Sequence, residues 1–331
     1  MNYSHLARLT CDYGIIQFAP HGEPDINSGC TTDDNARALL VALNMEGSQR
    51  EEYANLYCEA LQKAWRRGEG WRNWWLPNRG YVTDLDSEDS QGRAFMACCF
   101  GAVSGLPGVS KACREMAADA LPFIETLEFP RSNAYVLIGC TVLARELPED
   151  DRRISGIIQR CVEQLTGLYQ RYNSPGWRWF EDRMTYCNAI LPHALFSYCG
   201  IKADKKVQGI ARDSLMFLGD SLLAKGYFTP VGNRGWWTKG KKIPLFDQQP
   251  VEAGSMILAC REAFRVTGQK DFQSMMEIIW EWYLGKNIHD LPLINSETGG
   301  CHDGLTPDGL NPNQGAEALV TMLLSNQLLH S

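Results

Sequence analysis

Polar clusters that combine acids with arginines or amides recur along the chain, each just ahead of an apolar stretch. On a helix, spacings of three and four residues place Asp33 and Asp34 beside Arg37, and Asp89 beside Arg93. Helix capping accounts for one or two polar groups per cluster, but not for arginines one turn further along. The clusters read TTDDNAR (31–37), SEDSQGR (87–93), WFEDRMTYCN (179–188), FDQQPVEAG (246–254) and NPNQGAE (311–317).

Two interpretations of these charged pairs are open. Buried charges persist only when they are paired, so each pair is either a structural ion pair or part of the floor of a site. Ionisable groups gather at functional clefts, and the set as a whole therefore favours a site. The segment 298–318 adds Asp303 and Glu317, and we expect it to close over that site as an ordered loop. Cys301 and His302 lack a second spaced pair of ligands, so no metal or cofactor is expected.

Aromatic residues crowd the same stretches of sequence. Flat apolar faces suit sugar rings, and carboxylates, amides and arginines suit hydroxyl groups, so the combination favours a carbohydrate pocket. Any single ring is more often packed into the protein than placed against a ligand. The aromatic residues are Trp71, Trp74, Trp75, Tyr81, Trp177, Trp179, Phe180, Trp236 and Trp237.

Two alternating classes of helix must position these groups. Six predicted helices are apolar nearly all round, which is typical of helices buried on all sides. They span 33–46, 88–103, 132–146, 186–199, 250–266 and 314–328. Five amphipathic helices alternate with them, at 50–67, 109–127, 151–172, 203–224 and 271–285. With a short helix at 2–10, they predict an all-α ring of six helical hairpins, an (α/α)6 toroid.

The connector lengths indicate which end of the ring carries function. Steps from an apolar to an amphipathic helix are short: EGSQ, SGLPGV, LPED, GIKAD and TGQK. Several connections from an amphipathic helix to the next apolar helix are long, at 68–87, 173–185, 225–249 and 286–313. Long loops on a rigid scaffold commonly carry function, so the site is expected on the long-loop rim. We expect residues 1–331 to form one domain.

Composition narrows the functional classes. The 331 residues are 44% hydrophobic and 21% charged, as in a globular protein, with a formal charge of −7. This charge disfavours a nucleic-acid partner, which usually requires a clustered basic face. No apolar run is long enough for a signal peptide or a membrane helix, which predicts a cytoplasmic protein without a membrane partner. Its twelve cysteines are expected to be reduced and buried.

Three stretches carry a family resemblance: HLARLTCDYGIIQFAP…GCTTDDNARALLVA, SEDSQGRAF and DGLTPDGLNPNQGAEA. The chain resembles the six-hairpin toroids of glycoside hydrolases and sugar epimerases. It is more specifically similar to a bacterial glycosidase-like module found fused to, or encoded beside, glycosyltransferases and mannoside phosphorylases. The resemblance implies an oligosaccharide ligand and a glycosyltransferase or phosphorylase partner in the same pathway. The chain departs from it at Cys11 and Phe18, where an acid and a histidine are usual. Both positions lie outside the polar clusters and so cast little doubt on the pocket, but they weaken any claim of identical specificity.

The ring geometry suggests a mechanism. Facing apolar helices oppose Asp33 and Asp34 to Glu181 and Asp182. We therefore predict an inverting glycoside hydrolase in which one carboxyl of each set acts as acid or base on an oligosaccharide, mannose-containing ones included. In the same way Glu88 and Asp89 would oppose Glu252. The predicted binding residues are Arg37, Glu88, Asp89, Arg93, Trp177, Asn188, Gln248, Gln249, Glu252, Asp303, Asn313 and Glu317.

Two alternatives stay open. A sugar epimerase or isomerase would need a histidine base, for which His193 and His302 are the candidates. A non-catalytic carbohydrate-binding accessory module of a glycosyltransferase system would bind sugar without changing it.

Overall fold

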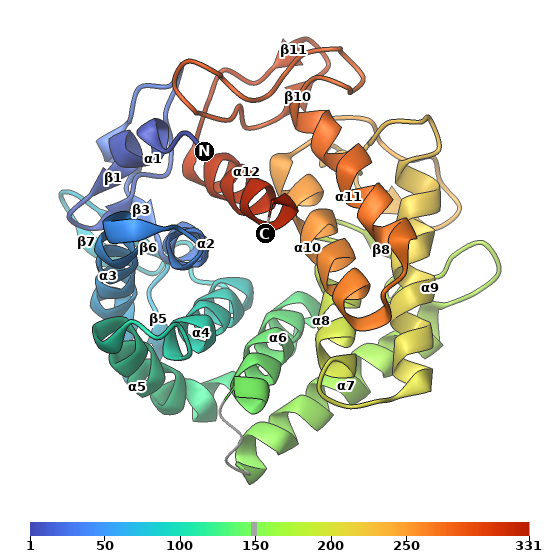
Figure 1. The fold of residues 1–331 in the computed structure, drawn as a ribbon, viewed down its shortest axis with the longest axis horizontal. Helices are drawn as coiled ribbons and strands as arrows, with labels where there is room; N and C mark the ends of the chain where they lie inside the picture. The colour runs from blue at the N-terminus through green and yellow to red at the C-terminus, as the bar shows by residue number, and fades with distance from the viewer. Residues whose placement is uncertain (147–150, 331) are drawn as a thin grey trace.

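Helices alternate between an inner and an outer layer around a central axis (Figure 1). The computed structural model describes residues 1–146 and 151–330, so the predicted LPED connector at 147–150 lies outside the described residues. Within these ranges there are twelve α-helices, as expected. The inner ones are α2 (Thr32–Leu43), α4 (Glu88–Ala102), α6 (Pro130–Glu146), α8 (Ile190–Cys199), α10 (Pro250–Thr267) and α12 (Ala316–Leu329). The outer ones are α1 (Ser4–Leu9), α3 (Gly47–Ala64), α5 (Pro107–Ile124), α7 (Arg152–Tyr172), α9 (Lys205–Leu222) and α11 (Lys270–Tyr283).

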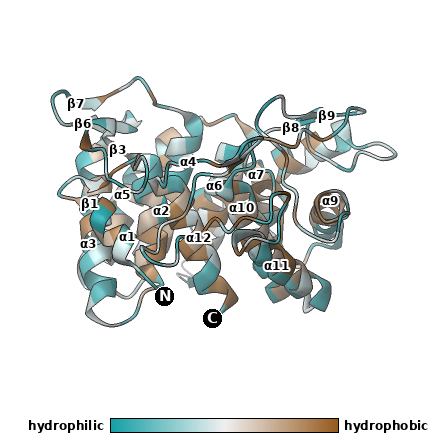
Figure 2. Cartoon of the chain, turned by 90° about the horizontal axis from the view of Figure 1, so that it is seen from above, coloured by the Kyte–Doolittle hydropathy of each residue, from teal (hydrophilic) through white to brown (hydrophobic). Residues whose placement is uncertain are grey.

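The distribution of apolar residues explains the two layers. In α12 every residue from Ala316 to Ser325 except Glu317 is buried. In α7 the buried residues form a single stripe that includes Ile154, Ile158 and Leu165, because only one side of an outer helix packs on the ring. In Figure 2, where the ribbon is coloured by residue hydropathy, apolar residues (brown) recur along inner helices such as α2 and α10.

Each inner helix packs against the inner helices on both sides, and α12 packs against α2. Backbone hydrogen bonds between the first and last segments seal this junction. The amide of Ala316 donates to the carbonyl of Gln17 (2.9 Å), and the amide of His21 donates to that of Pro312 (2.9 Å). The inner layer is therefore a closed ring.

Short strands order the long loops. β3 (Cys30–Thr31), β6 (Trp74–Leu76) and β7 (Gly80–Val82) form an antiparallel sheet, and β8 (Arg183–Met184) pairs with β9 (Trp237–Thr238). Both sheets lie at the same end of the ring (Figure 2). Three further two-stranded sheets join β1 (Thr10–Cys11) to β2 (Gly14–Ile15), β4 (Trp65–Arg66) to β5 (Gly70–Trp71), and β10 (Leu305–Thr306) to β11 (Gly309–Leu310).

The predicted helix at 186–199 begins only at Ile190. Cys187 has a φ of 45°, a left-handed conformation that cannot continue a right-handed helix. The turn before α8 presents Tyr186 to the rim instead.

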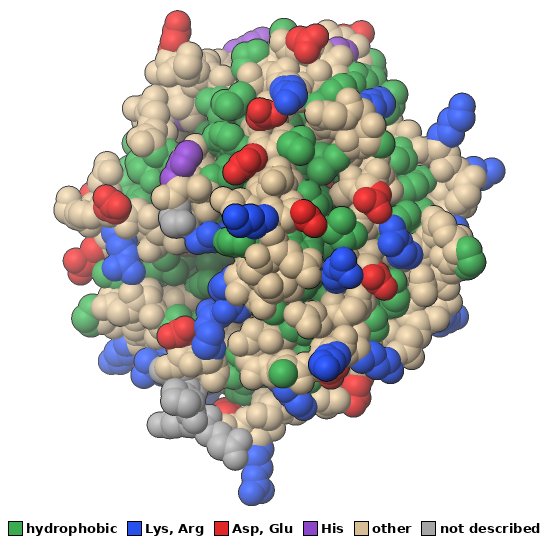
Figure 3. Space-filling view, turned by 45° about the vertical axis from the view of Figure 1, so that its right-hand side comes forward, with side chains coloured by type: hydrophobic (Ala, Val, Ile, Leu, Met, Phe, Trp, Pro, Cys, Tyr) green, Lys and Arg blue, Asp and Glu red, His purple; other side chains and the backbone are tan. Residues whose placement is uncertain are grey.

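All twelve cysteines are free thiols, and only Cys11 and Cys199 are partly exposed. In the described part of the chain, no helix is both long and apolar enough to cross a membrane. On the face shown in Figure 3, acidic and basic side chains are interspersed.

Candidate functional site

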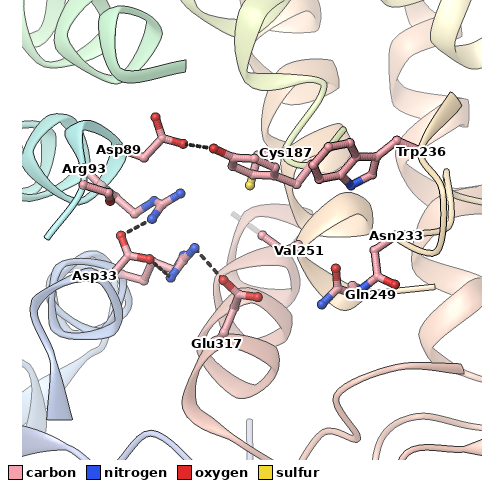
Figure 4. Close-up of a pocket in the computed structure, with 12 residues that line it drawn as sticks. Asp33, Asp89, Arg93, Cys187, Asn233, Trp236, Gln249, Val251 and Glu317 are labelled. Atoms are coloured by element: carbon pink, nitrogen blue, oxygen red, sulfur yellow. Dashed lines mark hydrogen bonds and ion pairs between the residues drawn. The ribbon is translucent and has the colours of Figure 1, made fainter. Parts of the chain in front are cut away.

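Two polar cavities adjoin each other at the long-loop end of the ring. The larger, here called the central cavity, has a volume of about 370 Å³, and its neighbour, the flanking cavity, about 330 Å³. Asp33, Gln249 and Glu317 line both cavities. The central cavity is also lined by Arg37, Ser87, Asp89, Arg93, Tyr186, Cys187, Asn233, Trp236 and Val251 (Figure 4). The flanking cavity is also lined by Gln17, Phe18, Thr31, Asp34, Asn73, Leu85, Asp303 and Gly315.

Arg37 joins three carboxylates. Its Nη1 donates to Asp33 Oδ2 and to Asp34 Oδ1, each at 3.1 Å, and its Nη2 donates to Glu317 Oε2 at 2.7 Å. The two aspartates lie one turn before Arg37 on α2, whereas Glu317 comes from the first turn of α12. The predicted i to i+3 and i to i+4 pairs therefore form, and the ring closure adds a third acid to them.

Arg93 on α4 holds Asp33 from the opposite side. It is ion-paired with Asp33 Oδ1, and its Nη2 donates to the Tyr135 hydroxyl at 2.7 Å while the guanidinium lies over the Tyr135 ring. Burial alone would raise the pKa of Asp33, but the charges of Arg93 and Arg37 outweigh it and lower that pKa below its usual value. The side chain of Asp33 is consequently ionised at neutral pH.

Asp34 differs from its neighbour in its protonation. It is almost fully buried, and burial raises its pKa to about 7, reinforced by the charges of Asp33 and Glu317 and opposed by Arg37. Thr31, the N-cap of α2, donates its hydroxyl to Asp34 Oδ2 at 2.7 Å and accepts the Asp34 amide at 3.1 Å. Near neutral pH Asp34 can therefore carry a proton at the wall of the flanking cavity.

Glu252 supports the turn before α8. Its carboxylate accepts the backbone N–H of Cys187 and the Asn188 side-chain amide (3.0 Å). It is buried and lines neither polar cavity, and burial raises its pKa to about 7. We predicted that Glu88 and Asp89 would face Glu252 across an open pocket. This prediction is wrong, because the side chains of Glu252 and Asn188 are hydrogen-bonded within this turn.

Glu181 and Asp182 do not join the cavities that contain Asp33. Glu181 is held by Arg131 Nη1 at 2.9 Å, and the side chain of Asp182 is 68% exposed and lies 3.9 Å from Arg183. They precede α8 by eight residues or more, on the arm of the loop that runs into β8 (Arg183–Met184). The predicted acid and base pairing across the axis is therefore corrected: only Asp33 and Asp34 of the four predicted catalytic carboxylates line a polar cavity.

The predicted binding residues divide in the same way. Arg37, Asp89, Arg93, Gln249, Asp303 and Glu317 line a polar cavity. Glu88 instead accepts the backbone N–H groups of Glu128 and Phe129, at 2.7 and 2.8 Å. Gln248 is buried and accepts the Trp282 indole N–H, and Trp177 is buried against Phe217 and Trp237. Asn313 donates to Asp303 at 2.6 Å, and burial raises the pKa of Asp303.

Several cavity residues were not among the predicted ones, notably Tyr186, Asn233 and Phe18. Trp236, one of nine loop aromatics considered, also lines the central cavity. Phe18, which lies outside the predicted polar clusters, also lines the flanking cavity. Tyr186 lies within the 179–188 cluster, so attention to its exposed tyrosine as well as its acids could have found it.

A third, apolar cavity of about 90 Å³ lies between the inner helices and shares Arg37, Arg93, Cys187 and Val251 with the central cavity. It is lined by residues such as Leu40, Ile138 and Leu324, and by His193. His302 is held by the Asn311 carbonyl at 2.7 Å. In the described ranges, no histidine lines either polar cavity.

No protein-family model matches the chain, and no curated protein matches it in sequence. Several solved structures match it in fold. A cellobiose 2-epimerase from Bacillus thermoamylovorans superposes with a TM-score of 0.75 at 12% identity, over 99% of this chain and 95% of that one. A sugar epimerase from a ruminal bacterium gives 0.73 at 12%, over 98% and 95%. A family 76 α-mannanase from Bacteroides thetaiotaomicron gives 0.64 at 11%, over 91% and 86%. The predicted fold, an (α/α)6 toroid of six helical hairpins, is thus confirmed.

Proposed function

We propose that this protein is a carbohydrate-active enzyme that hydrolyses a glycosidic bond in an oligosaccharide, with Asp34 as the proton donor. The observation that carries the proposal is the pair of adjacent carboxyls on α2 whose pKa values move apart. The pKa of Asp33 is lowered and the pKa of Asp34 is raised to about 7. Environments that separate the pKa values of two neighbouring acids are how glycosidases assign acid and base roles.

Glu317 is the residue best placed to activate water. Its side chain is 42% exposed and makes one ion pair, with Arg37, whereas Asp33 is held by two arginines. Glu317 and Asp34 bind different nitrogens of one guanidinium, which brings both carboxyls to the same arginine. The proposed reaction is inverting, in which a water fits between carboxyl groups roughly 6.5–9.5 Å apart.

Arg37 and Arg93 would bind sugar hydroxyls from the cavity floor, together with Asp89, Gln249 and Asp303 at the walls. Mannose-containing substrates stay the first to test. Hydrolysis is favoured over epimerisation because His193 and His302, the expected histidine bases, lie outside both polar cavities. A cytoplasmic location and a glycosyltransferase or phosphorylase partner remain predictions.

The test is incubation with manno- and gluco-oligosaccharides, with products and their anomeric form followed by NMR. Asp34→Asn and Glu317→Gln are expected to lose at least a hundredfold in turnover. Asp182→Asn serves as the matched control, because it removes an exposed acid outside the cavities. Full turnover by both cavity variants would refute the assignment. Deuterium uptake at a sugar carbon during turnover would indicate an epimerase instead, and sugar binding with no chemical change would indicate an accessory module.

A further inference from the structure

The shared residues of the two polar cavities define a junction. Asp33, Gln249 and Glu317 line both, so the proposed base Glu317 lies where the cavities meet, and the proposed acid Asp34 lines the flanking cavity. Each cavity alone has a volume typical of a small-molecule site, which is about 300–1,000 Å³. A ligand that filled both would pass directly over Asp33.

Tyr186 is a ring fixed in place although it is 41% exposed. Its hydroxyl donates to Asp89 Oδ2 at 2.7 Å, and the Arg131 guanidinium lies 5.0 Å from the ring centroid. Arg131 Nε also donates to the Tyr186 carbonyl at 2.6 Å. The ring is thus held through its edge and by Arg131, while its exposed surface faces the central cavity.

Trp236 presents a second exposed ring to the same cavity. Its backbone is left-handed, with φ of 50°, a strained conformation for a bulky residue that typically marks functional positions. The next residue, Trp237, is buried against Trp177 and Phe217 and pairs with Met184 across β8–β9. This pairing brings the Trp236 loop beside the Tyr186 turn, and leaves Trp236 40% exposed.

Trp236 stands apart from the charged floor, whereas Tyr186 is bonded to Asp89 at its edge. Figure 4 shows Trp236, Asn233 and Gln249 across the central cavity from Asp33 and Arg93. The central cavity thus has Trp236 on the side opposite Asp33 and Arg93 (Figure 4), and Tyr186 beside Asp89. The flanking cavity has its own exposed apolar residues, Phe18 and Leu85, at its wall.

We infer that Tyr186 and Trp236 form the stacking platform of one sugar subsite in the central cavity, that the flanking cavity is a second subsite, and that the substrate therefore spans at least two sugar units. This inference rests on the proposed function. Apolar ring faces of a sugar would lie on the two aromatics, and Asp89, Asn233 and Gln249 would receive its hydroxyl groups. The scissile bond would lie at the junction beside Asp33 and Glu317.

The test measures binding by titration calorimetry in the Asp34→Asn background, with mannose, mannobiose and mannotriose and with the matching gluco-oligosaccharides. A disaccharide of the accepted series should bind at least tenfold more tightly than its monosaccharide. Trp236→Ala should weaken disaccharide binding by about tenfold. Trp236→Phe should restore most of the lost affinity. Tyr186→Phe keeps the ring and loses the hydrogen bond to Asp89. Its disaccharide affinity should lie between that of Tyr186→Ala and that of the parent protein.

Phe129→Ala is the matched control, since Phe129 is exposed at the same end of the ring but lines neither polar cavity. Equal affinity for one and two sugar units, or unchanged disaccharide binding by both alanine variants, would overturn the two-subsite arrangement. So would the absence of binding by every sugar tested. If chain-length dependence disappears in Trp236→Ala while Asp34→Asn retains full turnover, the subsites stand and the proposed catalytic assignment fails.

Discussion

Adjacent aspartates on α2 show how neighbouring side chains of one type acquire different chemistry. Asp33 lies between two guanidinium groups, whose charges offset the free energy lost on burial. Asp34 faces Thr31 and shares only one of those guanidiniums. The remaining burial penalty favours its protonated form. A single step along the helix therefore separates a permanent anion from a group that can donate a proton near neutral pH.

Activity should decline on the alkaline side of neutrality. Because proton donation requires the acid form of Asp34, and its pKa is raised to about 7, kcat/KM should fall as the pH rises above about 7. The decline should approach tenfold per pH unit. The measurement is a pH profile of hydrolysis, with Asp182→Asn as control and the same alkaline limb expected for it. Constant activity from pH 6 to about 9 would exclude Asp34 as the donor.

Replacing Arg93 should lower the free energy of unfolding. Arg93→Met leaves Asp33 buried with one partner fewer, and breaking a buried ion pair costs about 3–5 kcal/mol. Arg67→Met is the matched control, because Arg67 pairs with Asp119 at the exposed surface, where such pairs contribute about 0–1 kcal/mol.

Denaturant unfolding at neutral pH measures both changes. The double variant Arg93→Met with Asp33→Asn should recover part of the lost free energy, since it removes the unpaired charge. Equal effects of the two arginine substitutions would show that the pair with Asp33 has no special role.

The sequence made part of this network predictable. Asp33, Asp34 and Arg37 lie within one helical turn, so their spacing alone brings them together. Glu317 and Arg37 are separated by 280 positions and meet only because the ring closes. Glu181 was predicted to lie at the N-terminal end of an apolar helix that begins at residue 186. The chain between Glu181 and α8 instead forms β8, which pairs with β9, and a turn, so Glu181 lies outside the polar cavities.

At the scale of elements, close approach of α4 and α6 carries Arg93 and Asp89 to the cavity. A Cβ added at Gly92 would lie 2.7 Å from the Ser132 carbonyl oxygen, which is too close for unchanged backbones. Gly92→Ala should therefore destabilise the protein by about 1–3 kcal/mol and also reduce activity, because Arg93 is the next residue.

Gly156→Ala is the matched comparison for Gly92→Ala. Gly156 lies in outer helix α7, where an added Cβ meets nothing within 4 Å. Its alanine variant should gain about 1 kcal/mol from helix propensity with unchanged activity. Thermal and denaturant melts together with turnover measure both variants. A neutral effect of Gly92→Ala would mean that the two helices tolerate more separation than their contact indicates.

The elements differ in how far sequence patterns predicted them. Helices with a single apolar stripe carry a clear period, and helices without a polar face form apolar runs too long for strands, so all twelve could be located. Strands of two or three residues have no measurable period. The turn at Cys187 depends on Glu252, a residue 65 positions away, and no local pattern reports such a partner.

At the scale of the whole molecule, we propose that residues 1–331 unfold as one domain. Each inner helix packs against two inner neighbours, and hydrogen bonds from Ala316 to Gln17 and from His21 to Pro312 join the first and last segments. A closed ring of this kind has no weak boundary at which to separate. Denaturant melts followed by helical circular dichroism and by tryptophan fluorescence should therefore coincide. Two resolved transitions would indicate two independent units.

The arginine floor also determines how molecules can pass through this ring. Arg37 and Arg93 lie between the central cavity and the apolar cavity below it, and both guanidiniums are fixed by carboxylates. These fixed side chains form a floor between the two cavities. If the proposed hydrolysis takes place in the central cavity, its product would leave by the same opening through which the substrate entered, and the next substrate would enter only after that exit.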